Sequence, residues 1–187
     1  GIESLLADEL RALGAHTVKE TRAGASFQGT LALAYRICLW SRTANRVLLP
    51  LARFEAPTPA ALYEGVRSID WAEHLAPDGR LAVDFSTSAS RITHSHFGAL
   101  KVKDAIVDQF RDAYGVRPSV DVERPDLRIN VYLRRDEATV GIDLSGDSLH
   151  RRGYRLEGAA APLKENLAAA ILLRASWPSI AEAGGTL

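Results

Sequence analysis

The sequence lacks several of the features that would place it quickly in a class. Its 187 residues include one cysteine, Cys38, and no methionine. A single cysteine cannot form a disulfide within the chain, which argues against a disulfide-stapled secreted domain. Because the chain begins at Gly1 and contains no methionine, we expect a fragment or a trimmed piece of a longer protein.

Net charge and long apolar runs are also missing. The formal net charge is zero, so no global field draws the chain to nucleic acid or to an anionic membrane, and any anion-binding site must be local. No apolar run approaches the roughly 18 residues of a membrane span, and no basic start followed by an apolar core marks a signal peptide. We therefore expect a cytoplasmic protein without a membrane partner.

The clearest pattern lies between Asp126 and Arg155. Apolar residues at every second position predict two half-buried strands over 127–133 and 138–144, joined by a link short enough for an antiparallel hairpin. The expected register pairs apolar residues on one face: Leu133 with Ala138, Val131 with Val140, Ile129 with Ile142 and Leu127 with Leu144. On the other face it places Arg128 opposite Asp143 and Tyr132 opposite Thr139.

The rest of the chain alternates between helical and strand patterns. Helices are expected over residues 2–13, 31–40, 59–68, 97–113 and 163–175, and strands over 16–21, 25–28, 46–54 and 80–86. The elements up to residue 54 indicate an α+β layer, which would become β-α-β-β-α-β if one strand preceded Gly1. The proline-containing segment 55–60 fits a domain boundary.

Basic residues gather in three segments that contain no acidic residue. Residues 21–54 hold five arginines, residues 85–103 hold a second group, and residues 149–155 hold three arginines. Lysines in the first turns of a helix oppose its dipole, and a phosphate bound at the helix N-terminus would favour them. We predict phosphate contacts by Lys101, Lys103, Arg151, Arg152 and Arg155, with Arg91 and His94 as additional candidates. The alternative is that these are solvated surface residues and that the early arginines support the first layer.

No catalytic or metal-binding constellation is visible in the sequence. His94 and His96 lack a third ligand, and Cys38 lies among apolar residues and is interpreted as a packing residue. No glycine-rich phosphate motif occurs. Trp40, Trp71 and Trp177 can stack on bases, although packing is the more common use of such residues. We expect the chain itself to be non-catalytic, with no metal and no cofactor.

Four collinear blocks resemble the N-terminal part of bacterial 23S rRNA guanine-N2-methyltransferases of the K/L type. The blocks are residues 97–110, 124–133, 143–155 and 161–177. The resemblance implies an α+β chain with a ferredoxin-like region over 1–54 that lacks its first strand. It further implies a THUMP domain over 55–155, whose family motif begins near residue 30. Residues 156–187 would be the linker and first helix of a truncated Rossmann-like methyltransferase domain.

The same resemblance implies a function. The chain would hold structured large-subunit rRNA for the protein's own C-terminal methyltransferase domain, which uses S-adenosylmethionine. The cofactor and catalytic motifs of that domain do not occur before Leu187, so no such residues are carried over. Two other interpretations stay open, a small ferredoxin-like hydrolase of the acylphosphatase type and a protein-docking module.

Overall fold

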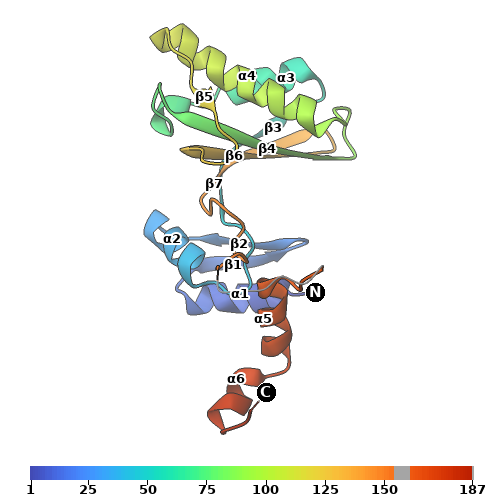
Figure 1. Ribbon diagram of the computed structural model, residues 1–187. Helices are drawn as coiled ribbons and strands as arrows, with labels where there is room; N and C mark the ends of the chain where they lie inside the picture. The colour runs from blue at the N-terminus through green and yellow to red at the C-terminus, as the bar shows by residue number, and fades with distance from the viewer. Residues whose placement is uncertain (154–160, 187) are drawn as a thin grey trace. The chain divides into compact units, whose positions relative to one another are not determined.

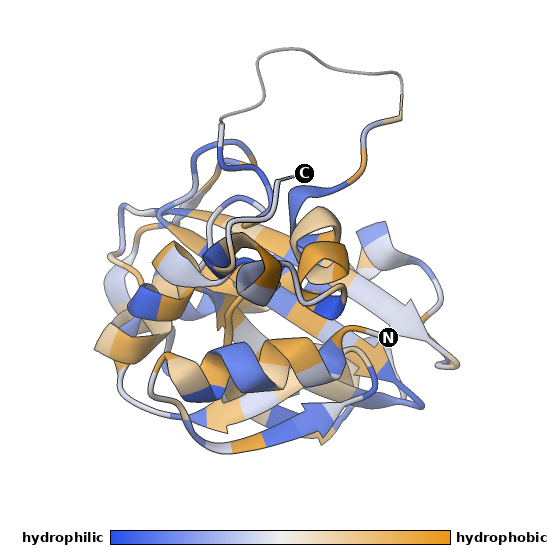
Figure 2. Ribbon diagram, turned by 90° about the horizontal axis from the view of Figure 1, so that it is seen from below, coloured by the Kyte–Doolittle hydropathy of each residue, from blue (hydrophilic) through white to orange (hydrophobic). Residues whose placement is uncertain are grey.

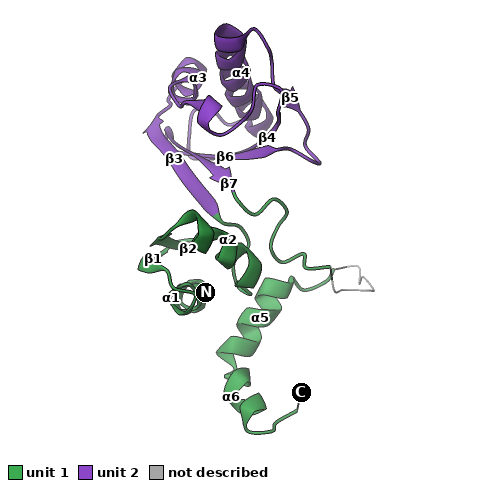
Figure 3. Cartoon of the chain, turned by 90° about the vertical axis from the view of Figure 1, so that its left-hand side faces the viewer, with its two compact units in different colours: residues 1–47, 144–187 green, residues 48–143 purple. Residues whose placement is uncertain are grey.

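The structure is a computed structural model that describes residues 1–153 and 161–186. Contacts divide the chain into two units. Unit 1 comprises Gly1–Val47 and Leu144–Leu187, and unit 2 comprises Leu48–Asp143, so the second unit is inserted into the sequence of the first (Figure 3).

Unit 2 is a five-stranded sheet with two helices, α3 and α4, on one face (Figure 1). The strand order is β3-β7-β6-β4-β5; β4 runs parallel to β5 and β6, and β7 runs antiparallel to β6 and β3. The elements in chain order are β3 Leu48–Glu55, α3 Pro59–Arg67, the 3-10 turn η1 Trp71–Glu73, β4 Arg80–Ser88, α4 Ser95–Tyr114, β5 Ser119–Val120, β6 Leu127–Arg134 and β7 Glu137–Asp143.

The hairpin β6–β7 has most of the expected register. The pairs 129/142, 131/140 and 133/138 are confirmed, and so is Tyr132 with Thr139. The connection is tighter than the expected four residues, because the strands continue to Arg134 and from Glu137 and leave a two-residue turn. Both turn residues, Arg135 and Asp136, have left-handed backbones, with φ of 52° and 62°, as a type I′ hairpin turn requires.

The two expected pairs at the open end of the hairpin, Leu127 with Leu144 and Arg128 with Asp143, lie beyond the paired ladder, which begins at Ile129 and Ile142. Strand β7 ends at Asp143, and the backbone N–H of Leu144 instead donates to the carbonyl of Val47 at 2.9 Å. Asp143 lies opposite Leu48 of β3. Arg128 turns toward the parallel neighbour β4, with its guanidinium 3.4 Å from the Asp84 carboxylate. The alternation of apolar and polar residues correctly predicted which side chains of β6 and β7 share a face. It did not predict that β4 and β3 flank this hairpin.

Strand β3 belongs to unit 2 and not to the first layer, where the sequence placed a strand over residues 46–54. It pairs antiparallel with β7, with Phe54 opposite Ala138 and Leu48 opposite Asp143. Strand β7, whose Val140 is fully buried, has β6 on one side and β3 on the other. Without β3, the backbone N–H and C=O groups on that side of β7 would be unpaired. Covering this edge satisfies the outward backbone groups of β7 and explains where β3 binds.

The described residues of unit 1 form a two-stranded sheet and four helices. Its elements are α1 Glu3–Ala12, β1 His16–Thr21, β2 Gly24–Gln28, α2 Leu31–Trp40, α5 Glu165–Arg174 and α6 Trp177–Glu182. Its core includes Leu10 and Ile37 from the first segment and Leu149 from the second. Helix α6 lies beyond residue 175, where the last expected helix ends. Its Pro178 is well accommodated in the first helical turn, where the missing N–H has no intrahelical acceptor.

Hydrophobic residues alternate with hydrophilic ones along the helices and strands (Figure 2). Among the described residues, none of the helices has both the length and the apolar character needed to cross a lipid bilayer.

We expect Gly141→Ala to destabilise the protein by about 1–3 kcal/mol, because a β-carbon at this position would lie 2.6 Å from the backbone carbonyl oxygen of Leu49 in β3. The measurement is the free energy of unfolding in urea. Gly24→Ala in β2 is the matched control, since a β-carbon there meets no atom within 4 Å. Both changes remove the same chain entropy from the unfolded state, so equal stabilities would show that β3 shifts away from β7 at no cost.

Candidate nucleic-acid interface

The predicted phosphate-binding residues are divided between the two units. Arg155 lies outside the described residues. Unit 1 contains Arg151 and Arg152, and unit 2 contains Arg91, His94, Lys101 and Lys103.

Arg91 lies in the loop between β4 and α4 and is fixed to the β6–β7 turn. Its backbone N–H donates to Asp136 Oδ1 at 2.7 Å, and its Nε lies 3.3 Å from Asp136 Oδ2. The backbone N–H of Asp136 in turn donates to Ser90 Oγ at 3.1 Å. The guanidinium is exposed, with 75% of the side chain accessible, but Asp136 balances its charge.

The two lysines do not lie in the first turn of their helix, so the dipole argument for them is wrong. Helix α4 begins at Ser95, two residues earlier than expected, with His94 as its N-cap residue. Lys101 and Lys103 are therefore its seventh and ninth residues, roughly 9 and 12 Å along the axis. Lys103 pairs with the neighbouring carboxylate of Asp104. His94 is exposed at the start of α4 and makes no side-chain capping hydrogen bond.

Arg152 binds the end of helix α2. Its guanidinium donates to the carbonyl oxygens of Leu39 at 2.9 Å and Ser41 at 2.8 Å. A cation at a helix C-terminus is favourable because the last carbonyls lack intrahelical donors and carry the negative end of the dipole. Arg151 next to it is exposed, and its backbone N–H donates to the Ser148 carbonyl at 2.9 Å. The two arginines therefore differ, since the Arg152 side chain supports the fold.

The loop after α2 is held by the buried carboxylate of Glu9. Glu9 Oε2 accepts hydrogen bonds from Ser41 Oγ at 2.7 Å, Thr43 Oγ1 at 2.6 Å and the Thr43 N–H at 3.1 Å. Glu9 Oε1 accepts from the backbone N–H and the Nε of Arg42, both at 3.0 Å. Burial raises the pKa of Glu9, but the bonds from Thr43, Arg42 and Ser41 outweigh it and hold the pKa below its ordinary value.

A second set of bonds joins this loop to the segment that returns from unit 2. Ser148 Oγ donates to Asn45 Oδ1 at 2.6 Å, and His150 Nδ1 lies 2.9 Å from the same hydroxyl. The Leu149 N–H donates to the Asn45 carbonyl at 2.9 Å, and Arg46 donates to the Gly146 carbonyl at 3.2 Å. Residues far apart in the sequence are thus brought together around the end of α2.

We call this assembly the α2 basic cluster, defined as Arg36, Trp40, Arg42, Arg46, Arg151 and Arg152. Its arginines come from residues 31–47, which contain no acidic residue, and from residues 144–153, where Asp147 is the one acidic residue. Guanidinium groups bind phosphate oxygens in pairs of parallel hydrogen bonds, and an exposed indole offers a face for base stacking. The cluster can therefore bind a polyanion that carries aromatic rings.

The sequence interpretation did not assign Trp40 or the early arginines to the site. Trp40 was expected to pack, but 63% of it is exposed. Arg36, Arg42 and Arg46 were interpreted as supports of the first layer. The sequence feature that could have indicated these arginines is the stretch 21–54, which contains no acidic residue. Only the fold shows that Arg152 binds at the end of the same helix.

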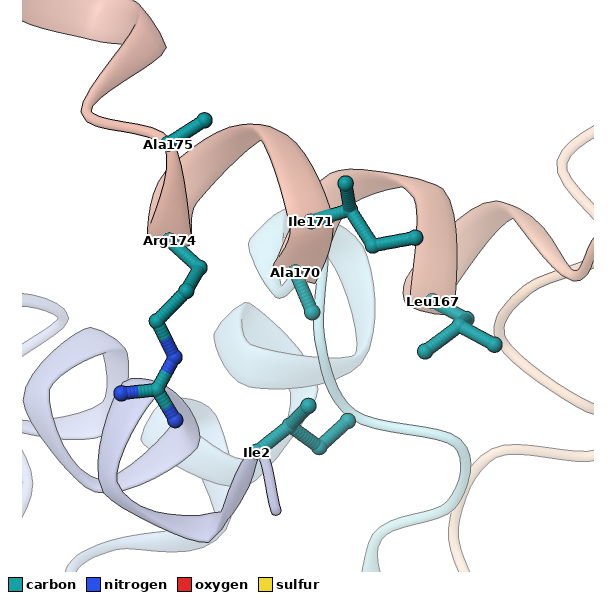
Figure 4. Close-up of a pocket in the computed structure, with 6 residues that line it drawn as sticks. All are labelled: Ile2, Leu167, Ala170, Ile171, Arg174 and Ala175. Atoms are coloured by element: carbon teal, nitrogen blue, oxygen red, sulfur yellow. The ribbon is translucent and has the colours of Figure 1, made fainter.

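Unit 1 also has an apolar pocket of about 380 Å³ beside helix α5 (Figure 4). It is lined by Ile2, Leu167, Ala170, Ile171, Arg174 and Ala175. The Arg174 guanidinium donates to the Gly1 carbonyl at 2.7 Å. This lining contains no acid–base pair, and residues 1–153 and 161–186 contain no group of three potential metal ligands.

Two family models match adjacent parts of the chain. The RlmL ferredoxin-like domain matches residues 1–48, and the THUMP domain matches residues 58–143. The expected fold class, a ferredoxin-like region followed by a THUMP domain, is confirmed.

Curated relatives match the chain over its whole length. It is 63% identical over 187 residues to a ribosomal RNA large subunit methyltransferase K/L of Syntrophotalea carbinolica and 64% identical to that of Methylococcus capsulatus. The match covers 100% of this chain but 26% and 25% of those proteins. The chain therefore spans about a quarter of the length of these relatives.

Solved structures of methyltransferases are similar as well. A predicted N6-adenine-specific DNA methylase from Listeria monocytogenes is 31% identical with a TM-score of 0.81, over 92% of this chain and 45% of that one. A protein assigned as a methyltransferase and complexed with SAH has the same identity and TM-score, over 93% and 46% of the two chains. TrmN from Thermus thermophilus is 28% identical with a TM-score of 0.69, over 94% and 52%.

We expect Glu9→Gln to lower the free energy of unfolding by about 2–4 kcal/mol at neutral pH, because the amide offers hydrogen atoms to donors that need an acceptor. A lowered folded-state pKa means that the carboxylate stabilises the protein above the unfolded-state pKa of about 4.3. This contribution is lost as the pH falls through the folded-state value. Urea unfolding at pH 7 and at acidic pH should show the gap between wild type and variant closing on acidification.

Asp8→Asn is the control for the Glu9 change. Asp8 is one residue away on α1, but its side chain is 73% exposed and pairs with Arg11 on the helix surface. We expect an effect below about 0.5 kcal/mol. A gap between wild type and Glu9→Gln that stayed constant with pH would contradict the assigned role of the carboxylate.

Proposed function

Since the chain belongs to the family of ribosomal RNA large subunit methyltransferases K/L, we propose that it is the part that holds structured rRNA for a SAM-dependent guanine-N2-methyltransferase. The observation that carries the proposal is the α2 basic cluster, in which two distant sequence segments present five arginines and an exposed tryptophan in a chain of zero net charge. Phosphate contacts dominate the binding of folded RNA and position it without reading its sequence.

The proposed phosphate contacts come from both units. In unit 1 they are Arg151, Arg152 and Arg155. In unit 2 they are Lys101, Lys103, Arg91 and His94. Arg151 is the best supported of these residues, because it is exposed and its side chain is not needed to cap α2. Arg91 and Lys103 are less favourable, because carboxylates of Asp136 and Asp104 already lie beside them.

The relatives imply S-adenosylmethionine, but the described residues do not fit a site for it. Doubly wound nucleotide-binding folds place a glycine-rich turn after a strand and an acidic residue further on. Parallel strand β4 is followed by residues 89–94, which contain neither glycine nor an acidic residue. We assign no cofactor contact to this chain and propose the cofactor for the whole protein, whose own methyltransferase domain would be the partner of this region. Because bacterial ribosomal RNA is modified in the cytoplasm, we place the protein there.

A protein-docking role is the second candidate. Helix α2 exposes 54% of Tyr35 and 67% of Leu39. The arginines around this helix favour RNA over a protein partner without strong acidity. A hydrolase of the acylphosphatase type needs an arginine and an asparagine at one site. The pocket beside α5 is lined by Arg174 but not by an asparagine, so it does not support this interpretation.

We expect the chain to bind structured rRNA fragments with an affinity that falls steeply as salt rises, and Arg151→Glu to weaken this binding about tenfold. Losing one phosphate contact should also lower the slope of log affinity against log salt by roughly 0.7–0.9. Fluorescence anisotropy over a range of KCl concentrations measures both quantities.

Arg117→Glu makes the same charge change at an exposed residue of unit 2 that is not among the proposed contacts. We expect it to leave the affinity within about twofold of wild type. If both variants lost affinity equally, overall charge and not the cluster would account for the binding. If wild-type chain retained no rRNA fragment even at low salt, the proposed function would be wrong.

A further inference from the structure

Among the described residues of unit 1, Trp40 is a large aromatic residue with an exposed side chain. It is the last residue of α2, and 63% of it is accessible, whereas Trp71 is fully buried. A large aromatic ring left in water at a fixed position loses the stabilisation that burial of its apolar surface would give. Its exposed indole face is therefore available to a ligand.

Arginines surround this residue on its own helix and in the chain that follows. Arg36 precedes Trp40 by four residues, so the two lie on the same side of α2. Arg42 follows it by two residues and remains 61% exposed although its Nε contacts Glu9. The Arg152 guanidinium bonds to the carbonyls of Leu39 and Ser41, the residues on either side of Trp40.

The backbone that carries the indole is held from two directions. Glu9 fixes residues 41–43 through five hydrogen bonds, and Arg152 fixes the carbonyls at the end of α2. Ligand binding therefore costs little backbone ordering at this position. A rigid aromatic face surrounded by guanidinium groups has the chemistry of single-stranded nucleic-acid sites, in which bases stack and phosphates pair with arginines.

We propose that Trp40 stacks on an unpaired nucleobase of the bound RNA, with Arg36 and Arg42 on the phosphates of the same strand. This inference rests on the proposed RNA-holding function and adds to it a preference for RNA with unpaired nucleotides. A paired and stacked base has both faces covered by its neighbours in the duplex, so an indole can reach only unpaired bases or helix ends. A protein partner would have to be apolar and acidic at once to match this surface.

The first test compares two RNA probes, a ten-nucleotide single strand and a blunt duplex of the same length with capped ends. Stacking on one base is worth about 1–3 kcal/mol, so Trp40→Ala should weaken binding of the single strand by about 5- to 100-fold. Binding of the duplex should change less than about twofold. Trp40→Phe keeps a smaller aromatic face and should recover part of the affinity.

The matched control is Leu31→Ala at the other end of α2. Leu31 is 51% exposed, so the change also removes exposed apolar surface from the same helix. It should leave the affinity for the single strand at the wild-type value. Thermal melting of every variant verifies that the fold is retained.

Tryptophan fluorescence gives an independent readout. The chain has three tryptophans, of which Trp71 is fully buried and Trp177 begins helix α6, so the quenching that is lost in the Trp40→Phe variant reports on Trp40. Titration with the single strand should quench wild-type emission, and Trp40→Phe should abolish this quenching.

Each result decides between specific interpretations. If wild type binds both probes and Trp40→Ala binds the single strand equally well, the stacking proposal is overturned and the RNA-holding function stands. If wild type binds neither probe, both proposals fail. If sedimentation shows that Trp40→Ala dissociates a dimer while RNA affinity is unchanged, this face is a contact between copies of the chain, which also overturns stacking.

Discussion

The buried carboxylate of Glu9 is the interaction on which the geometry of unit 1 depends. In place of the hydrogen bonds from water that it loses on burial, it accepts five hydrogen bonds from Ser41, Arg42 and Thr43. A buried charge is costly unless such partners surround it. Because all five donors lie in the loop that follows α2, the carboxylate fixes this loop to α1. The exposed positions of Trp40 and the Arg42 side chain follow from this attachment.

Unit 2 is inserted between the two segments of unit 1, and the pairing of β3 with β7 lets those two segments remain together. The first and last strands of unit 2 lie side by side, with Leu48 opposite Asp143. The chain therefore leaves and re-enters unit 1 at neighbouring points, where the Leu144 N–H donates to the Val47 carbonyl. Leu149 can then reach the core of unit 1, and Arg152 can reach the end of α2.

The periodicity of the sequence predicted most helices and strands, but it did not predict which strands lie side by side in the sheet. The alternation in β6 and β7 fixes which residues are buried, so the three central pairs of the hairpin followed from it. Alternation does not say which strand lies beyond the hairpin, and this is why β3 was placed in the wrong layer. The start of α4 was missed because Ser95 and His96 belong to a polar run typical of loops. The exposure of Trp40 was not predictable, since its neighbours Ile37 and Leu39 have the composition of a packed helix.

The cations of the two units differ in the partners that they already have, and these partners bear on the proposed phosphate contacts. In unit 2, carboxylates lie beside Arg67, Arg80, Arg91 and Lys103. Such pairs lower the attraction of a surface for phosphate, because each contact must compete with an existing partner. In unit 1, Arg152 is bonded to neutral carbonyls, whereas Arg42 pairs with the carboxylate of Glu9. The α2 basic cluster therefore contains both kinds of arginine: the proposed RNA contact would compete with a carboxylate at Arg42 but only with neutral carbonyls at Arg152.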